Sequence, residues 1–176
     1  GAAYAAVKGG RHITTSAIEH HAVLHTVEQL EREGFEATYL PVDADGFVDP
    51  DDLSRALRPD TTVVSVMYAN NEVGTIEPIA ELVRVAKAHD RHIVFHTDAV
   101  QAVGRIPATL REVPADLLSS SAHQLGAPPG IAVHPARRTV PLDPPAPGHR
   151  AAQPRRGTPA GAGRTAEGRD ARGARR

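Results

Sequence analysis

The run of residues 61–68 is the feature that most limits how this chain can fold. It reads Thr-Thr-Val-Val-Ser-Val-Met-Tyr, so nearly every position is β-branched or apolar. This composition is typical of a strand that is buried on both faces, as the strands of a parallel sheet are. The run therefore favours an α/β fold over an all-helical or an all-β one.

Helical patterns alternate with further strand patterns along the chain. Four other runs have strand character, namely residues 11–15, 35–42, 92–96 and 115–118. Residues 23–30 and 78–89 carry apolar side chains at helical spacing, and Asp49-Pro50 is typical of a helix start. Strands that alternate with helices of this length predict a mostly parallel sheet with helical crossovers.

Caps and turns give the expected ends of these elements. The Ala-rich residues 1–8 have the character of the end of a helix, so the chain is expected to begin within a fold. Ser16-Ala17-Ile18-Glu19 has the spacing of a capping box, which predicts a helix start at Ser16. Gly34 is the expected helix stop, and Asp43-Ala44-Asp45-Gly46 the expected turn.

Polar side chains follow the predicted strands closely. They are Asn71, Asp98, Gln101, Ser121 and His123. Any one of them alone is explained as a cap or turn residue. Because a parallel sheet brings the carboxyl ends of its strands to one edge, the set together predicts a ligand site there.

Composition excludes several other classes of function. The chain has no cysteine, which excludes disulfides, thiolate metal sites and a cysteine nucleophile, and fits a cytoplasmic setting. No apolar run approaches the ~18 to 20 residues of a membrane span, and no signal pattern opens the chain. We therefore expect neither a membrane partner nor a targeting segment.

The histidines do not form a recognisable metal motif. His21 and His25 stand four residues apart, but Ala22 occupies the position where the zinc-protease motif has glutamate. No metal site is therefore expected. His12, His89, His92 and His134 are interpreted as surface or strand-end residues.

The C-terminal part differs in composition from the rest. From Arg137 onward there are ten Arg and three acidic residues, a balance of +7 that leaves −8 on the first 136 residues. This part is rich in Pro, Gly and Ala and has no aromatic residue. We predict a domain over residues 1–133 and a disordered tail over residues 134–176, which is solvated and does not bind nucleic acid.

Five motifs, in order along residues 1–133, resemble those of the cysteine desulfurases in the class V aminotransferase group. They are His20-His21-Ala22 after Ile18-Glu19, the stretch from Leu40-Pro41-Val42-Asp43 to Val48-Asp49, Ala69-Asn70-Asn71-Glu72-Val73-Gly74-Thr75, His96-Thr97-Asp98-Ala99-Val100-Gln101, and Ser121-Ala122-His123. The resemblance implies a three-layer α/β sandwich, part of the large domain of a fold-type I enzyme that uses pyridoxal phosphate.

The resemblance also implies roles around the cofactor ring. Asp98 would pair with the pyridine nitrogen and keep it protonated, so that the ring accepts electrons from the substrate. His20 would stack on the ring face and serve catalysis. Gln101 would donate to the phenolic oxygen, and Asn71 would bind near that oxygen and the substrate carboxylate.

Ser121 and His123 would contact the cofactor phosphate, and the next residue in the family is the lysine that forms the Schiff base. Here that catalytic position holds Gln124. An amide can neither form an imine with the aldehyde nor act as the amine base. Lys8 and Lys87 are the only lysines, and Lys87 is expected far from the cluster. A chain with this sequence should therefore not convert substrate, and covalent attachment of the cofactor is not expected.

Two further family features are not found, a Gly-Ala-Thr phosphate loop upstream and a catalytic cysteine loop downstream. The tail composition suggests a frameshift near His134. By resemblance, the parent enzyme removes sulfur from L-cysteine, passes a persulfide to a sulfur acceptor or iron–sulfur scaffold protein, and works as a homodimer. The alternatives are a selenocysteine lyase, another class V aminotransferase-like enzyme, a non-catalytic scaffold, or a decayed gene product.

Overall fold

A computed structural model describes residues 1–107, 112–121, 132–133 and 140 of the chain. The elements follow one another in the order α1 (Ala2–Ala6), β1 (His12–Ser16), α2 (His21–Arg32), β2 (Glu36–Leu40), α3 (Pro50–Ala56), β3 (Thr61–Ser65), α4 (Ile79–His89), β4 (Val94–Asp98), β5 (Leu117–Ser121) and β6 (Ala132–Val133). The predicted alternation of strands and helices is confirmed for the part of the chain up to β4.

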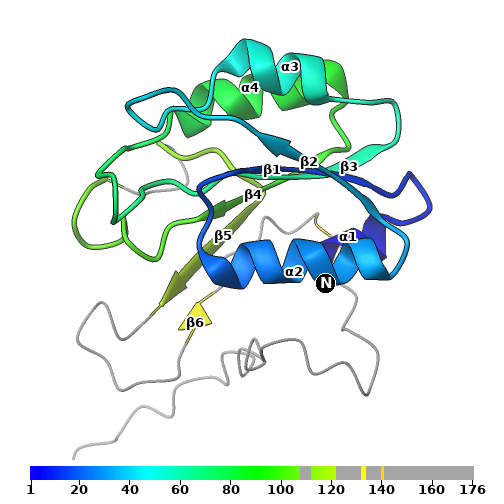
Figure 1. The fold of residues 1–176 in the computed structure, drawn as a ribbon, viewed down its shortest axis with the longest axis horizontal. Helices are drawn as coiled ribbons and strands as arrows, with labels where there is room; N and C mark the ends of the chain where they lie inside the picture. Colours follow the sequence, from blue (N-terminus) through cyan, green and yellow to red (C-terminus); the bar gives the residue numbers. More distant parts are fainter. Residues whose placement is uncertain (108–111, 122–131, 134–139, 141–176) are drawn as a thin grey trace, which may run out of the picture.

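The strands form one sheet in the order β2-β1-β3-β4-β5-β6. The first five are parallel to one another, and the two-residue β6 pairs with β5 in the antiparallel direction. Helices α3 and α4 lie on one side of the sheet and α1 and α2 on the other (Figure 1). The three-layer α/β fold with a mostly parallel sheet is thus as predicted.

Each face of the sheet has its own apolar core. On the α3 and α4 side, Phe95 and Val64 of the sheet belong to the same buried cluster as Leu53 and Leu82 of the helices. On the other side, Ile13 of β1 and Val27 of α2 belong to a second, smaller cluster. Adjacent strand residues point to opposite faces, which is why the β-branched run of β3 serves both cores.

The helix start predicted at Ser16 is wrong. Ser16 is the last residue of β1, and α2 begins at His21, where His20 is the N-cap and its Nδ1 accepts from the backbone N–H of Ala22 at 3.2 Å. Ser16 Oγ does donate to Glu19 Oε1 at 2.7 Å. Glu19 does not complete a capping box, because the same oxygen accepts from the backbone of Met67.

Several predicted ends shift by a few residues. The run of residues 61–68 is a regular strand only as far as Ser65, although the backbone N–H of Val66 and of Tyr68 still donates to carbonyls of β4. The strand predicted over residues 92–96 is Val94–Asp98, so Asp98 ends the strand and does not follow it. The Asp49 cap with Pro50 in the first turn of α3 is confirmed.

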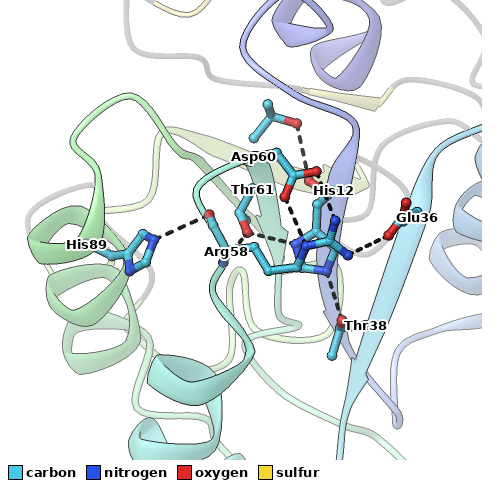
Figure 2. Close-up of polar contacts among 8 residues, drawn as sticks. His12, Glu36, Thr38, Arg58, Asp60, Thr61 and His89 are labelled. Carbon is cyan, nitrogen blue, oxygen red and sulfur yellow. Dashed lines mark hydrogen bonds and ion pairs between the residues drawn. The ribbon is translucent and has the colours of Figure 1, made fainter.

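The amino edge of the sheet is closed by a polar cluster around His12. This residue begins β1 and is fully buried, with Nδ1 2.7 Å from Thr61 Oγ1 and Nε2 2.8 Å from Thr38 Oγ1 (Figure 2). Arg58 pairs with Asp60 at the rim of this cluster, at 2.9 Å. His12 is therefore a strand-end residue, as interpreted, but not a surface residue.

Among the described residues, no helix is both long and apolar enough to span a membrane.

Candidate functional site

The carboxyl ends of β1, β3, β4 and β5 bring most of the predicted site residues to one edge of the sheet. His20 follows β1, Asn71 follows β3, Asp98 ends β4 and Ser121 ends β5. These four strands are neighbours in the sheet, so their ends lie in sequence along the edge. His123 and Gln124 lie outside the described residues.

Asp98 is fixed by its backbone and leaves part of its carboxylate free. Its carbonyl accepts from the backbone N–H of Tyr68 at 2.8 Å, and its Oδ1 accepts from the backbone N–H of Val100 at 3.0 Å. Its other oxygen, Oδ2, makes no hydrogen bond within the described part of the chain. A half-buried carboxylate with one free acceptor is suited to hold a positively charged N–H donor.

His20 is the N-cap residue of α2, and its imidazole is exposed. Its ring lies 6.1 Å from that of His21, and the His21 ring lies 5.8 Å from that of His25. Within the described residues no cluster of three or more potential ligands could hold a metal ion. The exposed ring of His20 offers a flat face beside the edge of the sheet.

Two further predicted site residues carry amide side chains. Asn71 is exposed in the loop after β3, and Gln101 is half-buried in the turn after β4. Neither side chain makes a hydrogen bond to another described residue, so no described group occupies the donors and acceptors of these two amides. Ser121 is placed by its backbone, which pairs with Ala132 of β6.

Glu19 is the residue at this edge whose importance the sequence did not reveal. Its side chain is only 4% exposed, and Oε1 accepts from Ser16 Oγ at 2.7 Å and from the backbone N–H of Met67 at 2.6 Å. Its Oε2 has no hydrogen-bond partner among the described residues. Burial raises the pKa of Glu19 to about 8, and the negative charges of Asp98 and Glu77 contribute in the same direction. Glu19 lies three residues after the end of β1, and its partner Met67 could not be read from the sequence.

Asn70 was also missed as a separate contributor. Its Nδ2 donates to the carbonyl of Ile18 at 3.0 Å, and its Oδ1 accepts from the backbone N–H of Glu72 at 2.7 Å and of Val73 at 3.0 Å. The bonds to Glu72 and Val73 are those of an Asx turn, for which asparagine is a common residue. The bond to Ile18 joins the loop after β3 to the loop after β1.

A histidine also links three strands near this edge. His96 Nδ1 lies 2.9 Å from Ser65 Oγ of β3, and Nε2 lies 2.8 Å from Ser119 Oγ of β5. His96 and Asp98 are two residues apart in β4 and therefore face the same side of the sheet. These bonds fix β3, β4 and β5 relative to one another just before the strands end.

Two hollows of about 410 Å³ each lie away from these residues. One is lined by Pro41, Phe47 and Pro78 beside the starts of α3 and α4. The other lies at the amino edge and includes Lys8 and Lys87. The predicted site is thus an edge with converging polar groups, and neither of these hollows forms part of it.

The model of the aminotransferase class-V family matches residues 1–153. The chain belongs to this family. A cysteine desulfurase IscS from Dictyoglomus turgidum is 55% identical over 144 residues, which cover 82% of this chain and 36% of that protein. Another, from Methanosarcina thermophila, is 51% identical over 144 residues, which cover 82% of this chain and 35% of that protein. The chain thus spans about a third of the length of these curated relatives.

Solved structures show the same relationship. A NifS-like protein matches with a TM-score of 0.75 and 41% identity, over 78% of this chain and 38% of that chain. SspA in complex with cysteine matches with a TM-score of 0.69 and 37% identity, over 75% of this chain and 38% of that chain. Class V aminotransferases and cysteine desulfurases are pyridoxal phosphate enzymes, so the predicted family and its cofactor class are confirmed. The domain boundary between residues 133 and 134 stays a prediction.

Proposed function

We propose that this chain is the cofactor-binding part of a cysteine desulfurase, and that the carboxyl edge of its sheet holds pyridoxal phosphate. The observation that carries the proposal is Asp98, which ends β4 next to the loop that carries Asn71 and whose Oδ2 makes no hydrogen bond to another described residue. The parent reaction would remove sulfur from L-cysteine and leave alanine and a persulfide for iron–sulfur assembly. Support comes from relatives that are cysteine desulfurases and from a similar structure that contains cysteine.

The residues of this edge fit the cofactor. When bound, pyridoxal phosphate supplies an electron-withdrawing ring that stabilises negative charge on the substrate carbon. Asp98 Oδ2, which no described residue binds, could accept a hydrogen bond from the ring N–H, and a carboxylate there favours the protonated form of that nitrogen. The exposed imidazole of His20 would cover a ring face, and the amides of Asn71 and Gln101, which bind no other described side chain, would donate to oxygen atoms of the ligand.

Gln124 limits what the chain can do with that cofactor. Its amide nitrogen is not nucleophilic and does not accept protons near neutral pH, so it can neither hold the aldehyde covalently nor move a proton on the substrate carbon. Lys87 cannot substitute for a lysine at this position, because its Nζ lies 2.6 Å from Asp116 Oδ2 at the amino edge of the sheet. Lys8 lines the hollow at that same edge. We therefore propose cofactor binding without turnover.

Titration with pyridoxal phosphate, followed by absorbance and by borohydride reduction with peptide mapping, tests this function. Wild-type protein should bind the cofactor without a covalent adduct at the carboxyl edge, and Asp98→Asn should weaken binding. Lys87→Ala is the matched control, since that side chain lies at the opposite edge and should not alter the affinity. The absence of saturable binding, or a reduced adduct at a lysine of the site, would contradict the proposal.

The amino acid at position 124 gives a second test. Gln124→Lys should introduce a reducible adduct at that position, because an amine can then react with the aldehyde. It should not by itself restore sulfur release, because the chain contains no cysteine to accept the sulfur. Sulfide or alanine production by that variant would contradict this part of the proposal.

A further inference from the structure

Two buried side chains join the loop after β1 to the segment after β3. Glu19 Oε1 accepts from the backbone N–H of Met67 at 2.6 Å, and Asn70 Nδ2 donates to the carbonyl of Ile18 at 3.0 Å. In both bonds the segment after β3 supplies the donor and the loop after β1 supplies the acceptor, and each of the two contributes one side chain and one backbone group. The loops at residues 17–20 and 66–71 are therefore held together at two points.

Each linking residue directly precedes an exposed residue of the candidate site. Glu19 is 4% exposed and is followed by the exposed His20, while Asn70 is 9% exposed and is followed by the exposed Asn71. A buried, hydrogen-bonded residue restricts the backbone of its neighbour, so the position of each exposed side chain depends on the link before it. Asn70 restricts Asn71 from both sides, because its Oδ1 also binds the backbone N–H of Glu72 at 2.7 Å.

The same segment is tied to Asp98 on its other side. The backbone N–H of Met67 faces Glu19, whereas that of the next residue, Tyr68, donates to the carbonyl of Asp98 at 2.8 Å. The segment after β3 thus lies between the loop that carries His20 and the strand end that carries Asp98. A change in either link would alter the spacing among all three predicted ligand groups.

We propose that Glu19 and Asn70 are positioning residues, which fix His20 and Asn71 relative to Asp98 at the carboxyl edge of the sheet. The inference deepens the proposed function and rests on it only for the identity of the ligand. The links themselves are bonds within this chain. Glu19 and Asn70 are not assigned contacts with the cofactor.

Glu19 fills this role as an uncharged acid. Its Oε1 accepts two hydrogen bonds, while its Oε2 is buried without a partner among the described residues. Burial holds its pKa at about 8, and Asp98 and Glu77 disfavour a further negative charge nearby, while the bonds from Ser16 and Met67 favour the ionised form. Glutamine has the same shape and keeps the accepting oxygen, so Glu19→Gln should preserve the link.

The test compares four variants of the full chain. Glu19→Ala removes one link, Glu19→Gln retains it, and Asn70→Asp removes the amide donor to Ile18 while retaining the oxygen that binds Glu72. Glu28→Ala, an exposed carboxylate on α2, is the control. The measurements are amide hydrogen exchange over residues 17–22 and 66–74, the NMR signals of the His20 imidazole, and the affinity for pyridoxal phosphate.

Glu19→Ala and Asn70→Asp should each raise exchange in both loops roughly tenfold, shift the His20 signals, and weaken cofactor binding by a similar factor. Glu19→Gln and the control should remain close to wild type. If Glu19→Ala fails to fold, Asn70→Asp decides the question, because aspartate has nearly the same size and shape as asparagine. Unchanged loops and His20 signals in Asn70→Asp would overturn the inference. If wild type binds no cofactor but the variants still mobilise both loops, the proposed function fails and the positioning role stands.

Discussion

Replacing Glu19 with glutamine should remove a large part of the pH dependence of this chain's stability. Burial raises the pKa of the Glu19 carboxyl from its ordinary value of 4.5 to about 8 in the folded chain. Between these two values the folded chain keeps the proton and the unfolded chain releases it. Unfolding therefore releases a proton and becomes easier as the pH rises.

The expected magnitude follows from the size of this change. Each pKa unit is worth about 1.36 kcal/mol, so a rise from 4.5 to about 8 corresponds to roughly 5 kcal/mol. This contribution to the free energy of unfolding is fully present below pH 4.5 and is lost as the pH rises to about 8. Glu77 acts in the same direction, since burial raises its pKa to about 7, but it is present in both proteins.

Urea unfolding followed by circular dichroism at pH 5, 6, 7 and 8 measures the effect. The difference in free energy of unfolding, Glu19→Gln minus wild type, should grow by ~1.4 kcal/mol per pH unit in this range. Glu28→Gln, on the exposed side of α2, should show no such slope. A difference that does not change with pH would mean that Glu19 titrates alike in the folded and unfolded chains. A difference that falls as the pH rises would mean that the fold stabilises the ionised form of Glu19.

Three further predictions concern the fold. Because burial lowers the pKa of His12 below its ordinary 6.5, the contribution of His12 to the free energy of unfolding should fall as the pH is lowered through 6.5, opposite in sign to that of Glu19. An NMR titration midpoint of this imidazole at or above 6.5 would contradict that reasoning. Leu53→Ala should lower the free energy of unfolding by ~2 to 5 kcal/mol, since the side chain is fully buried, and a loss below ~1 kcal/mol in urea unfolding would show that the core relaxes around it. Asp49→Ala should lower the free energy of unfolding by ~1 kcal/mol, because it removes the cap on the backbone N–H of Asp51, whereas Asp49→Asn should be nearly neutral. Equal decreases in melting temperature for the two variants would count against the capping role.

Local sequence patterns predicted the elements of this fold well where one chemical cause dominates. The run at residues 61–68 is apolar because β3 contributes to cores on both faces, and it could be read without knowledge of its neighbours. Asp49-Pro50 predicted the start of α3 because cap and first turn are adjacent in the chain. Most strand ends were displaced by one to three residues, since hydrogen bonding to the neighbouring strand decides where a strand stops.

The candidate site was predicted in part for the same reason. Asn71 and Gln101 could be placed after strands from the strand pattern, Asp98 was placed just after a strand that it in fact ends, and the family resemblance gave all three roles. The sequence could not tell that Glu19 and Asn70 hold the loops, because Met67 and Ile18, their partners, lie 48 and 52 positions away. The capping-box prediction failed on this point, since the spacing of Ser16 and Glu19 fits a cap while the bond to Met67 is a tertiary contact.

The sequence alone determined the class of fold, the order of its elements and the chemical character of the groups at the strand ends. These properties depend on periodicity and side-chain type, which are local. Only the tertiary structure decided that β1 lies between β2 and β3, and that the loops after β1 and β3 are joined by buried side chains. Strand order and loop spacing depend on contacts between distant residues, whose energies arise only when the chain has brought them together.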